Sequence, residues 1–395
     1  MKILLSAGEA SSDLYGAQLS VALRRRARAD DEPLEFVGVG GERMRAAGCE
    51  IIVEARHLSV VGMTEILSHL PKIYSEFRKL LRAVDGSPKK PDVAVVIDSP
   101  AFNFRVAREM HARGIPVVYF VAPQLWAWRE YRVRRVQKWI KKVLCIFPFE
   151  EEFYRRHGVE VEYVGHPLAD LDPTNISREE YARQNSLDPE KTWIALLPGS
   201  RRKEAAAAMP AMAGAAALLL SQDPSLQFVL PAAPSLDPDH IRRLMDDCFE
   251  RDPHRPVLVR DARAALFHSR AAVIASGTAT AEAALMGTPF VAVYRLSSLT
   301  FFAARRLVKV PFAAMPNLIA GRQVVPELLQ EKFTPQSVAA ELKKIISDGP
   351  ERQQMLAALA EVCDKLKFSG SARGATAIER AADAVLRAVV SSGER

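Results

Sequence analysis

The chain has 395 residues, 49% of them hydrophobic and 26% charged, and a formal net charge of +7. This is more than one hydrophobic core usually holds, so two domains are expected, and the positive charge favours anionic partners. The four cysteines form no CxxC pair, which argues against a disulfide framework or zinc site and favours reduced thiols in a cytosol. We expect no membrane-spanning run and no signal peptide, because the N-terminus enters a strand at once.

The first half of the chain alternates between strand-like and helical patterns. Strands are predicted at residues 2–6, 35–39, 92–97, 116–121, 143–147 and 160–164, and helices at 13–27, 63–84, 102–113 and 131–142. Such alternation is typical of a parallel, doubly wound sheet, whose ligand sites lie at the carboxyl ends of the strands.

A polar link over residues 170–189 precedes a second round of the same pattern. Strands are predicted at 193–197, 227–230, 257–259, 272–275 and 290–293, and helices at 203–220 and 279–286. The sequence therefore predicts an α/β fold of two Rossmann-like, doubly wound domains facing a cleft. We place the domains at residues 1–170 and 186–334, with a helical C-terminal segment at 335–395.

The loop after the first strand carries a carboxylate and two hydroxyls, Glu9, Ser11 and Ser12, followed by Asp13. It does not match GxGxxG, which argues against NAD binding. At least one of Ser11, Ser12 and Asp13 is expected to be a capping residue. Glu9 is harder to explain by packing, so it is a candidate for the site.

Asp98 ends an apolar strand and is followed by a second candidate, Asn103. A carboxylate at the mouth of a parallel sheet is partly desolvated, which raises its pKa and suits it to general-base catalysis. The alternative is an Asp that caps the next helix. We favour the catalytic interpretation.

The segment 122–128 places Gln124 between a proline and two tryptophans, which either line a sugar or acyl pocket or fill the core. A basic run over residues 129–142 follows. A solvated helix face is the default for such a run, but the scarcity of acids also suggests phosphate or an anionic membrane surface. His166 stands alone, without metal-ligand spacing, so no protein-bound metal is expected.

The second half opens with Gly199, Ser200, Arg201 and Arg202 at the end of a strand. Gly199 permits a tight turn. Arginines at the start of a helix oppose its dipole unless an anion is present, so this loop is a candidate anion site.

A second strand–turn–helix element carries Ser276, Gly277 and Thr278 in its turn. Backbone N–H groups and the helix dipole suit a diphosphate there, and Glu282, one turn further on, could accept hydrogen bonds from a ribose. The alternative is that Ser276 merely caps the helix and Glu282 faces solvent. Asn317, which follows a proline, is a further candidate hydrogen-bonding ligand.

Two stretches, residues 58–82 and 299–312, combine apolar faces with basic residues. Such faces suit an anionic bilayer surface. An amphipathic helix packed on its own sheet is the commoner explanation.

Seven motifs, in this order, resemble those of the lipid-A-disaccharide synthase family, inverting glycosyltransferases of the GT-B architecture. They are GEASSD, GVGGERM, APQLWAW, VGHPLAD, LLPGSRRKE, ASGTATAE and MPNLIAG, and they cover the chain from Met1 to about residue 329. The family usually has Gly where Ser12 stands and an acid where Ala101 stands.

The resemblance implies transfer of 2,3-diacylglucosamine from UDP to the 6-hydroxyl of 2,3-diacylglucosamine 1-phosphate, giving a β-1′,6-linked disaccharide. Asp98 would be the base. Arg201 and the loop at Ser276 would hold the diphosphate without metal or other cofactor, and Glu282 the ribose. A cytoplasmic enzyme, peripheral on the inner membrane, is implied, and a homodimer with exchanged C-terminal segments is possible.

Two alternatives remain at this stage. A UDP-sugar 2-epimerase of the same architecture would need acids and a His placed for elimination rather than one acceptor-side base. A non-enzymatic basic protein could bind nucleic acid, but the chain has no recognised nucleic-acid-binding motif.

Overall fold

The computed structural model describes residues 1–27, 33–58, 63–233, 236–249, 255–296, 310–368 and 374–393. The chain divides into two compact units. Unit 1 comprises Met1–Asp170 and Leu366–Arg395, and unit 2 comprises Leu171–Lys365. Each unit is built on its own parallel sheet, as the sequence predicts.

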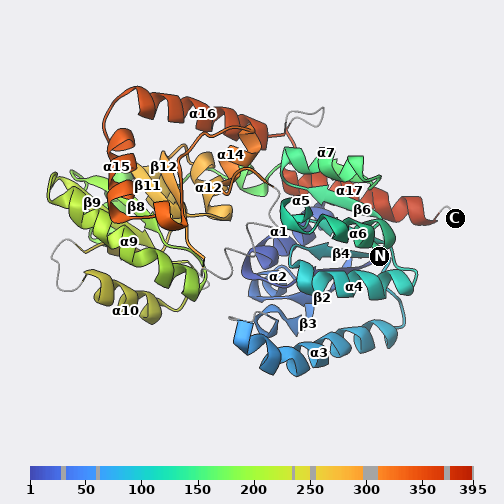
Figure 1. The fold of residues 1–395 in the computed structure, drawn as a ribbon. Coiled ribbons are helices and arrows are strands. Elements are labelled where there is room, and N and C mark those ends of the chain that lie inside the picture. Colours follow the sequence, from blue (N-terminus) through green and yellow to red (C-terminus); the bar gives the residue numbers. More distant parts are fainter. Residues whose placement is uncertain are drawn as a thin grey trace. The chain divides into compact units, whose positions relative to one another are not determined.

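Across the described residues, unit 1 contains a seven-stranded parallel sheet in the order β3-β2-β1-β4-β5-β6-β7 (Figure 1). Its strands are β1 Lys2–Ala7, β2 Glu35–Gly40, β3 Glu50–Glu54, β4 Val93–Ile97, β5 Val117–Phe120, β6 Lys142–Cys145 and β7 Val161–Tyr163. The strand order reverses between the neighbours β1 and β4. In open α/β sheets such a reversal is where ligands bind, beyond the carboxyl ends of the strands.

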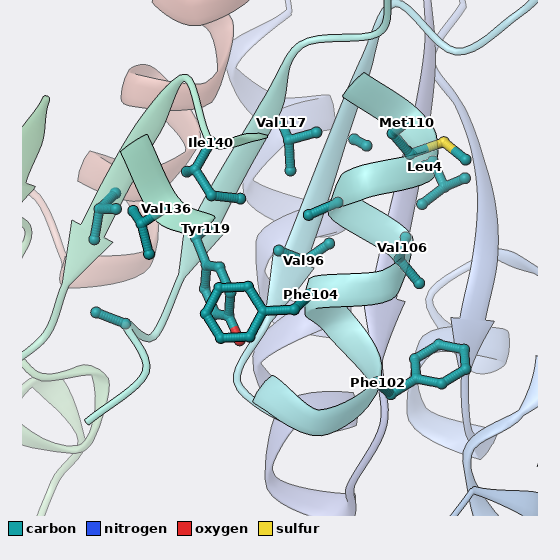
Figure 2. Close-up of a cluster of buried hydrophobic side chains, with 14 of the residues drawn as sticks. Leu4, Val96, Phe102, Phe104, Val106, Met110, Val117, Tyr119, Val136 and Ile140 are labelled. Carbon is teal, nitrogen blue, oxygen red and sulfur yellow. The ribbon is translucent and has the colours of Figure 1, made fainter. Parts of the chain in front are cut away.

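The helices of unit 1 flank this sheet. They are α1 Ala10–Arg26, α2 Glu42–Ala46, α3 Met63–Asp85, α4 Pro100–Ala112, α5 Leu125–Trp128, α6 Val133–Trp139, α7 Pro148–Arg156 and α17 Ala377–Gly393, with short 3-10 helices at Ala55–His57, Glu130–Arg132 and Pro167–Asp170. Strand β4 is buried along its whole length, and Phe104, Tyr119 and Val136 from three different elements meet in one apolar cluster (Figure 2). This packing fixes the strand that leads to Asp98.

Unit 2 has a six-stranded parallel sheet over the residues described, in the order β10-β9-β8-β11-β12-β13. Its strands are β8 Thr192–Leu197, β9 Leu226–Pro231, β10 Val257–Val259, β11 Ala271–Ala275, β12 Phe290–Tyr294 and β13 Glu327–Leu329. Here the order reverses between β8 and β11, so the loops after these two strands lie side by side.

The helices of unit 2 are α8 Arg178–Asn185, α9 Arg202–Leu220, α10 Pro238–Phe249, α11 Ala262–His268, α12 Thr278–Leu285, α14 Met315–Ala320, α15 Pro335–Ile346 and α16 Pro350–Leu366, with a 3-10 helix at Gln330–Lys332. Helices α9 and α15 approach closely, because a Cβ on Gly214 would lie 2.8 Å from Cγ of Pro335. Glycine at this position therefore sets the spacing of the two helices.

Helix α9 corrects the expectation that no run is apolar enough to cross a bilayer. Among the described helices, α9 alone is long and apolar enough to cross a bilayer, judged by length and composition. Its Met209 and Met212 side chains are nevertheless buried inside unit 2. A buried core helix passes the same test, so this is weak evidence for a membrane span.

The C-terminal segment 335–395 is divided between the units. Helix α15 and nearly all of α16 belong to unit 2, whereas α17 belongs to unit 1 and packs along α1. There, Asp383 pairs with Arg26 of α1 at 2.8 Å, and Nε of Arg380 donates a hydrogen bond to the Val164 carbonyl. The polypeptide thus returns to its first sheet.

Candidate functional site

Asp98 lies directly after β4, at the strand-order reversal of unit 1. Its backbone and that of Ser99 are left-handed, with φ of +50° and +44°, a costly conformation for residues other than glycine. The amide of Asn103 and the hydroxyl of Tyr119 both donate to the Asp98 carbonyl at 2.7 Å. These two hydrogen bonds hold the strained turn and so fix the direction of the Asp98 side chain.

The carboxyl of Asp98 is a weaker acid than an ordinary aspartate. Burial and, to a smaller extent, the nearby carboxylate of Glu9 together raise its pKa to about 6, against a hydrogen bond from the Ser99 backbone that lowers it. A carboxyl group of this pKa is ionised at neutral pH and is a stronger base than an exposed aspartate. Both properties are required of a general base.

Glu9 is exposed and lies at the same sheet edge as Asp98. Its position follows from the register, because Ala7 of β1 pairs with Ile97 of β4. Glu9 precedes α1, and its side chain makes no capping hydrogen bond to that helix. The side chain is therefore directed by neither packing nor capping, which keeps it as a candidate for the acceptor side.

The capping role expected in this loop falls on Asp13, but for a different helix. Its carboxylate accepts hydrogen bonds from the backbone N–H groups of Gly41, Arg43 and Met44 at the start of α2. Ser11 is exposed. Ser12 is fully buried and its Oγ has no hydrogen-bond partner among the described residues.

Asn103 was a candidate for the acceptor side or the cleft, and the structure places it inside the protein. The side chain is fully buried. Its Nδ2 donates to the carbonyls of Ile97 and Asp98 at 2.9 and 2.7 Å, and its Oδ1 accepts from the Ser6 hydroxyl at 2.7 Å. Asn103 acts on the site through the backbone of Asp98 and has no amide group left for a ligand.

Gln124 is exposed in the loop that follows β5. Two side chains of helix α7, which the sequence analysis did not identify, form hydrogen bonds with this loop. Buried Glu150 accepts a hydrogen bond from Nε1 of Trp126 at 3.0 Å, and the Tyr154 hydroxyl donates to the Pro123 carbonyl at 2.6 Å. Burial raises the pKa of Glu150 to about 8. The four-residue spacing of Glu150 and Tyr154 puts both on one helix face.

His166 is buried after β7, and its ring lies 5.3 Å from that of Phe147. Its Nδ1 accepts a hydrogen bond from the Leu168 backbone at 3.2 Å. The burial and this local bond match the structural role that is usual for a lone histidine.

In unit 2, Gly199 and Ser200 follow β8, and Arg201 and Arg202 begin α9. Gly199 has a φ of +121°, which favours glycine. Arg201 is three-quarters exposed and pairs with Glu204 at 2.7 Å, whereas Arg202 lies 3.8 Å from Asp237. The first turn therefore contains an acid that compensates for these arginines. This weakens the argument that their position requires a bound anion.

The second loop of unit 2 follows β11, next to the first. Gly277 and Thr278 are exposed at the start of α12. Gly277 occupies the N-cap position, and because it has no side chain it cannot cap the helix with a hydrogen bond. The alternative role for Ser276 as the cap does not apply, because its hydroxyl donates to the Ala313 carbonyl at 2.6 Å. The N–H of Thr280 donates to the Gly277 carbonyl at 3.1 Å, which leaves the N–H groups of Thr278 and Ala279 at the start of α12 for an anion.

Glu282 is mostly buried, with 21% of its side chain exposed, which corrects the alternative that it faces solvent. Its Oε1 lies 3.6 Å from Nη1 of Arg263, a residue of α11 that the sequence analysis missed. Burial raises the pKa of Glu282, and Arg263 opposes that rise. The Arg263 Nη1 atom is buried and has no hydrogen-bond partner among the residues described.

Asn317 was predicted to be a donor-binding ligand, and its contacts indicate a structural role instead. Its Oδ1 accepts from the backbones of Val324 and Val325 at 2.6 and 2.9 Å. Its Nδ2 donates to the Val325 carbonyl and to Glu327 Oε1, at 2.9 and 2.7 Å. Glu327 in turn accepts from the backbone of Ala314 at 2.9 Å. The fully buried Asn317 thus ties α14 to β13.

Replacing Asn317 by Ala should lower the free energy of unfolding by about 2–4 kcal/mol, because it leaves buried backbone groups without partners. Urea denaturation would measure the loss. Asn185→Ala is the matched control, since its side chain makes a single hydrogen bond to the Tyr181 carbonyl at a helix end. Equal losses in the two variants would contradict the structural role of Asn317.

Among the described residues, no three His, Cys, Asp or Glu side chains gather in a way that could hold a metal ion. The prediction that the reaction needs no metal or other cofactor remains a prediction.

Solved structures of two kinds share this fold. A UDP-GlcNAc 2-epimerase from Neisseria meningitidis, bound to UDP-GlcNAc, has a TM-score of 0.65 at 14% identity and covers 99% of this chain and 100% of its own. CalG4, the calicheamicin glycosyltransferase, has a TM-score of 0.58 at 17% identity, with 98% of both chains covered. At such identities the likeness establishes the two-domain architecture alone.

Sequence relatives decide the family. The family model described as lipid-A-disaccharide synthetase matches residues 3–381. The lipid-A-disaccharide synthase of Koribacter versatilis is 52% identical, with 98% of both chains covered. That of Myxococcus xanthus is 42% identical, covering 98% of this chain and 97% of its own. The motifs, the paired sheets and these matches agree, and the chain belongs to the lipid-A-disaccharide synthase family of glycosyltransferases.

Proposed function

We propose that this glycosyltransferase moves 2,3-diacylglucosamine from UDP to the 6-hydroxyl of 2,3-diacylglucosamine 1-phosphate, with Asp98 as the general base. The overall reaction follows from family membership. The observation that carries the role of Asp98 is its fixed position at a strand end together with a pKa of about 6.

The chemistry is a single in-line displacement, because an α-linked donor gives a β-linked product. The acceptor oxygen attacks the anomeric carbon while its proton passes to a carboxylate oxygen of Asp98. The bond from that carbon to the UDP oxygen breaks, and its electron pair leaves with the diphosphate. The transition state resembles an oxocarbenium ion, so the enzyme must provide one base and stabilise the leaving group.

The leaving group would be held by unit 2. The uncapped N-terminus of α12 offers N–H groups and a partial positive charge at Gly277 and Thr278, and exposed Arg201 adds a guanidinium, although it also pairs with Glu204. Glu282 would accept hydrogen bonds from the two ribose hydroxyls. The neighbouring guanidinium of Arg263 favours the ionised form of Glu282 that this requires.

We further propose that the enzyme works in the cytoplasm, on the inner face of the inner membrane, because both substrates carry acyl chains. Most of the stretch 299–312 lies outside the described residues, as do residues 59–62 and the side chains of 63–70 in the stretch 58–82. A homodimer with exchanged C-terminal segments remains a prediction. We expect no nucleic acid as partner.

The assigned reaction is tested by measuring UDP release with the donor alone and with donor plus acceptor. A transferase of this kind should release UDP only when the acceptor sugar phosphate is present, in equal amounts with the disaccharide. UDP release that does not depend on the acceptor, or conversion of the donor at its C2 carbon, would instead support the epimerase alternative.

A further inference from the structure

The segment after α5 carries a surface that the transfer reaction does not use. We call it the basic-aromatic face, and it consists of two aromatic residues and five cations: Trp128, Arg129, Tyr131, Arg132, Arg134, Arg135 and Lys138. It spans the end of α5, the 3-10 helix Glu130–Arg132 and helix α6, which are neighbours in unit 1 (Figure 1).

Helix α6 has an inner and an outer side. Val133, Val136 and, just beyond the helix, Ile140 are buried, and Figure 2 shows Val136 and Ile140 directed at the apolar cluster of unit 1. The exposed residues Arg135 and Lys138 follow Tyr131 by four and seven positions, which is the spacing of one helix face. Tyr131, Arg135 and Lys138 therefore share the outer side, where Arg134 is exposed as well.

The aromatic residues of this face are exposed and lie against arginines. Trp128 is 44% exposed and Tyr131 is 67% exposed. The guanidinium of Arg129 lies 3.6 Å from the centre of the Trp128 ring, and that of Arg132 lies 5.9 Å from the Tyr131 ring. Tryptophan and tyrosine beside basic residues are the side chains that lie at membrane–water interfaces, with the ring at headgroup level.

Several exposed cations elsewhere among the described residues pair with acids on their own helix. On α7, Arg155 and Arg156 pair with Glu151 and Glu152, and on α15 Lys344 pairs with Glu341. Within the part of the chain that the structure describes, none of the five cations of the basic-aromatic face forms an ion pair with a carboxylate. Glu130 is the one acid in the segment 128–138, and it lies 3.3 Å from Nε2 of His157. The face thus carries five cations against one carboxylate.

We propose that the basic-aromatic face docks this enzyme on an anionic phospholipid bilayer. The cations attract the headgroups, and Trp128 and Tyr131 enter the interface. The face follows β5 along the chain, and β5 pairs with β4, the strand that ends directly before Asp98. Docking there holds the acceptor side of unit 1 at the membrane from which acylated sugars are drawn. The proposal rests on the membrane association proposed above.

Cosedimentation with vesicles tests the proposal, using phosphatidylglycerol mixed with phosphatidylcholine and, separately, phosphatidylcholine alone. The wild-type protein should bind the anionic vesicles at low salt and release at high salt. The double variant Arg134→Glu/Arg135→Glu should bind at least about thirtyfold more weakly, since each basic residue near such a surface contributes appreciably. Trp128→Ser/Tyr131→Ser should also weaken binding, but without changing its salt dependence.

The matched control is Arg155→Glu/Arg156→Glu on α7, which changes the net charge of the same unit by the same amount. It should bind anionic vesicles nearly as the wild type does. If both double variants lose binding equally, net charge rather than this face is responsible and the proposal fails. If Arg134→Glu/Arg135→Glu binds anionic vesicles as the wild type does, the basic-aromatic face is not the docking surface, although the enzyme still associates with membranes. If the wild-type protein does not bind anionic vesicles, both this proposal and the proposed membrane association fail. If the protein binds DNA, loses that binding in Arg134→Glu/Arg135→Glu, and keeps it when vesicles are added, the face is a nucleic-acid surface instead.

Discussion

Replacing Asp98 by Asn should lower kcat by at least about a hundredfold, because positioned proton transfer contributes roughly 10²–10⁴-fold to a rate. Asparagine keeps the size and shape of the side chain but cannot accept the proton of the acceptor hydroxyl. The backbone hydrogen bonds from Asn103 and Tyr119 to residue 98 do not depend on its side chain. The turn should therefore persist, and steady-state assays at saturating substrates would measure the loss.

The same role predicts an unusual pH profile. Because burial and Glu9 raise the pKa of Asp98 to about 6, wild-type activity should fall as the pH drops through about 6, where the base becomes protonated. The Asn variant should lack this acid limb. Glu9→Gln removes a negative charge that raises the pKa of Asp98, so its acid limb should move to lower pH.

A control at the opposite end of the same strand separates catalysis from folding. Asp92 precedes β4, and its carboxylate accepts a hydrogen bond from the Lys2 backbone at 2.6 Å. Asp92→Asn should change stability more than kcat and keep the acid limb. Near-full turnover in Asp98→Asn at saturating substrates would show that the base lies elsewhere.

The sequence predicted the elements that bury long apolar runs. Strands such as β4 and β11 are buried along their whole length. A central parallel strand is covered on both faces, so its sequence is a continuous apolar run that is easy to recognise. The edge strands β3 and β13 were missed. Both begin with glutamate and neither is apolar throughout, whereas all three residues of the predicted edge strand β10 are apolar.

Residue type and loop position identified candidate loops, but they did not show which side chains in or beside those loops are already used inside the protein. Asn103 and Asn317 both stand beside candidate loops, yet both amides are used to hold backbone in place. Local sequence does not reveal where an amide's partners lie, because these come from tertiary packing. The contact between Glu282 and Arg263 could not be predicted for the same reason, because Arg263 is nineteen positions away on another helix.

The second large effect is expected in donor binding. Glu282→Ala should weaken UDP binding by roughly ten- to a hundredfold, because hydrogen bonds to a charged group contribute about 1.5–3 kcal/mol. The UDP affinity of Glu282→Gln, whose side chain still accepts hydrogen bonds through one oxygen, should lie between those of Glu282→Ala and the wild type. Arg201→Ala should weaken UDP binding as well, but by less than Glu282→Ala does, because this arginine also pairs with Glu204. Isothermal titration calorimetry would measure all three affinities.

Donor binding must be distinguished from loss of the Glu282–Arg263 pair, because removing one partner leaves the other charge buried and lowers stability. Thermal unfolding of each variant therefore accompanies the titration, and Arg263→Lys, which keeps a positive charge near Glu282, should retain most of the affinity. Glu341→Gln on α15, which removes a surface ion pair of the same unit, should bind UDP as the wild type does. Asp98→Asn should also bind UDP normally, because Asp98 belongs to unit 1. If Glu282→Ala and Arg201→Ala both remain folded and bind UDP with unchanged affinity, the donor site does not lie at these loops of unit 2.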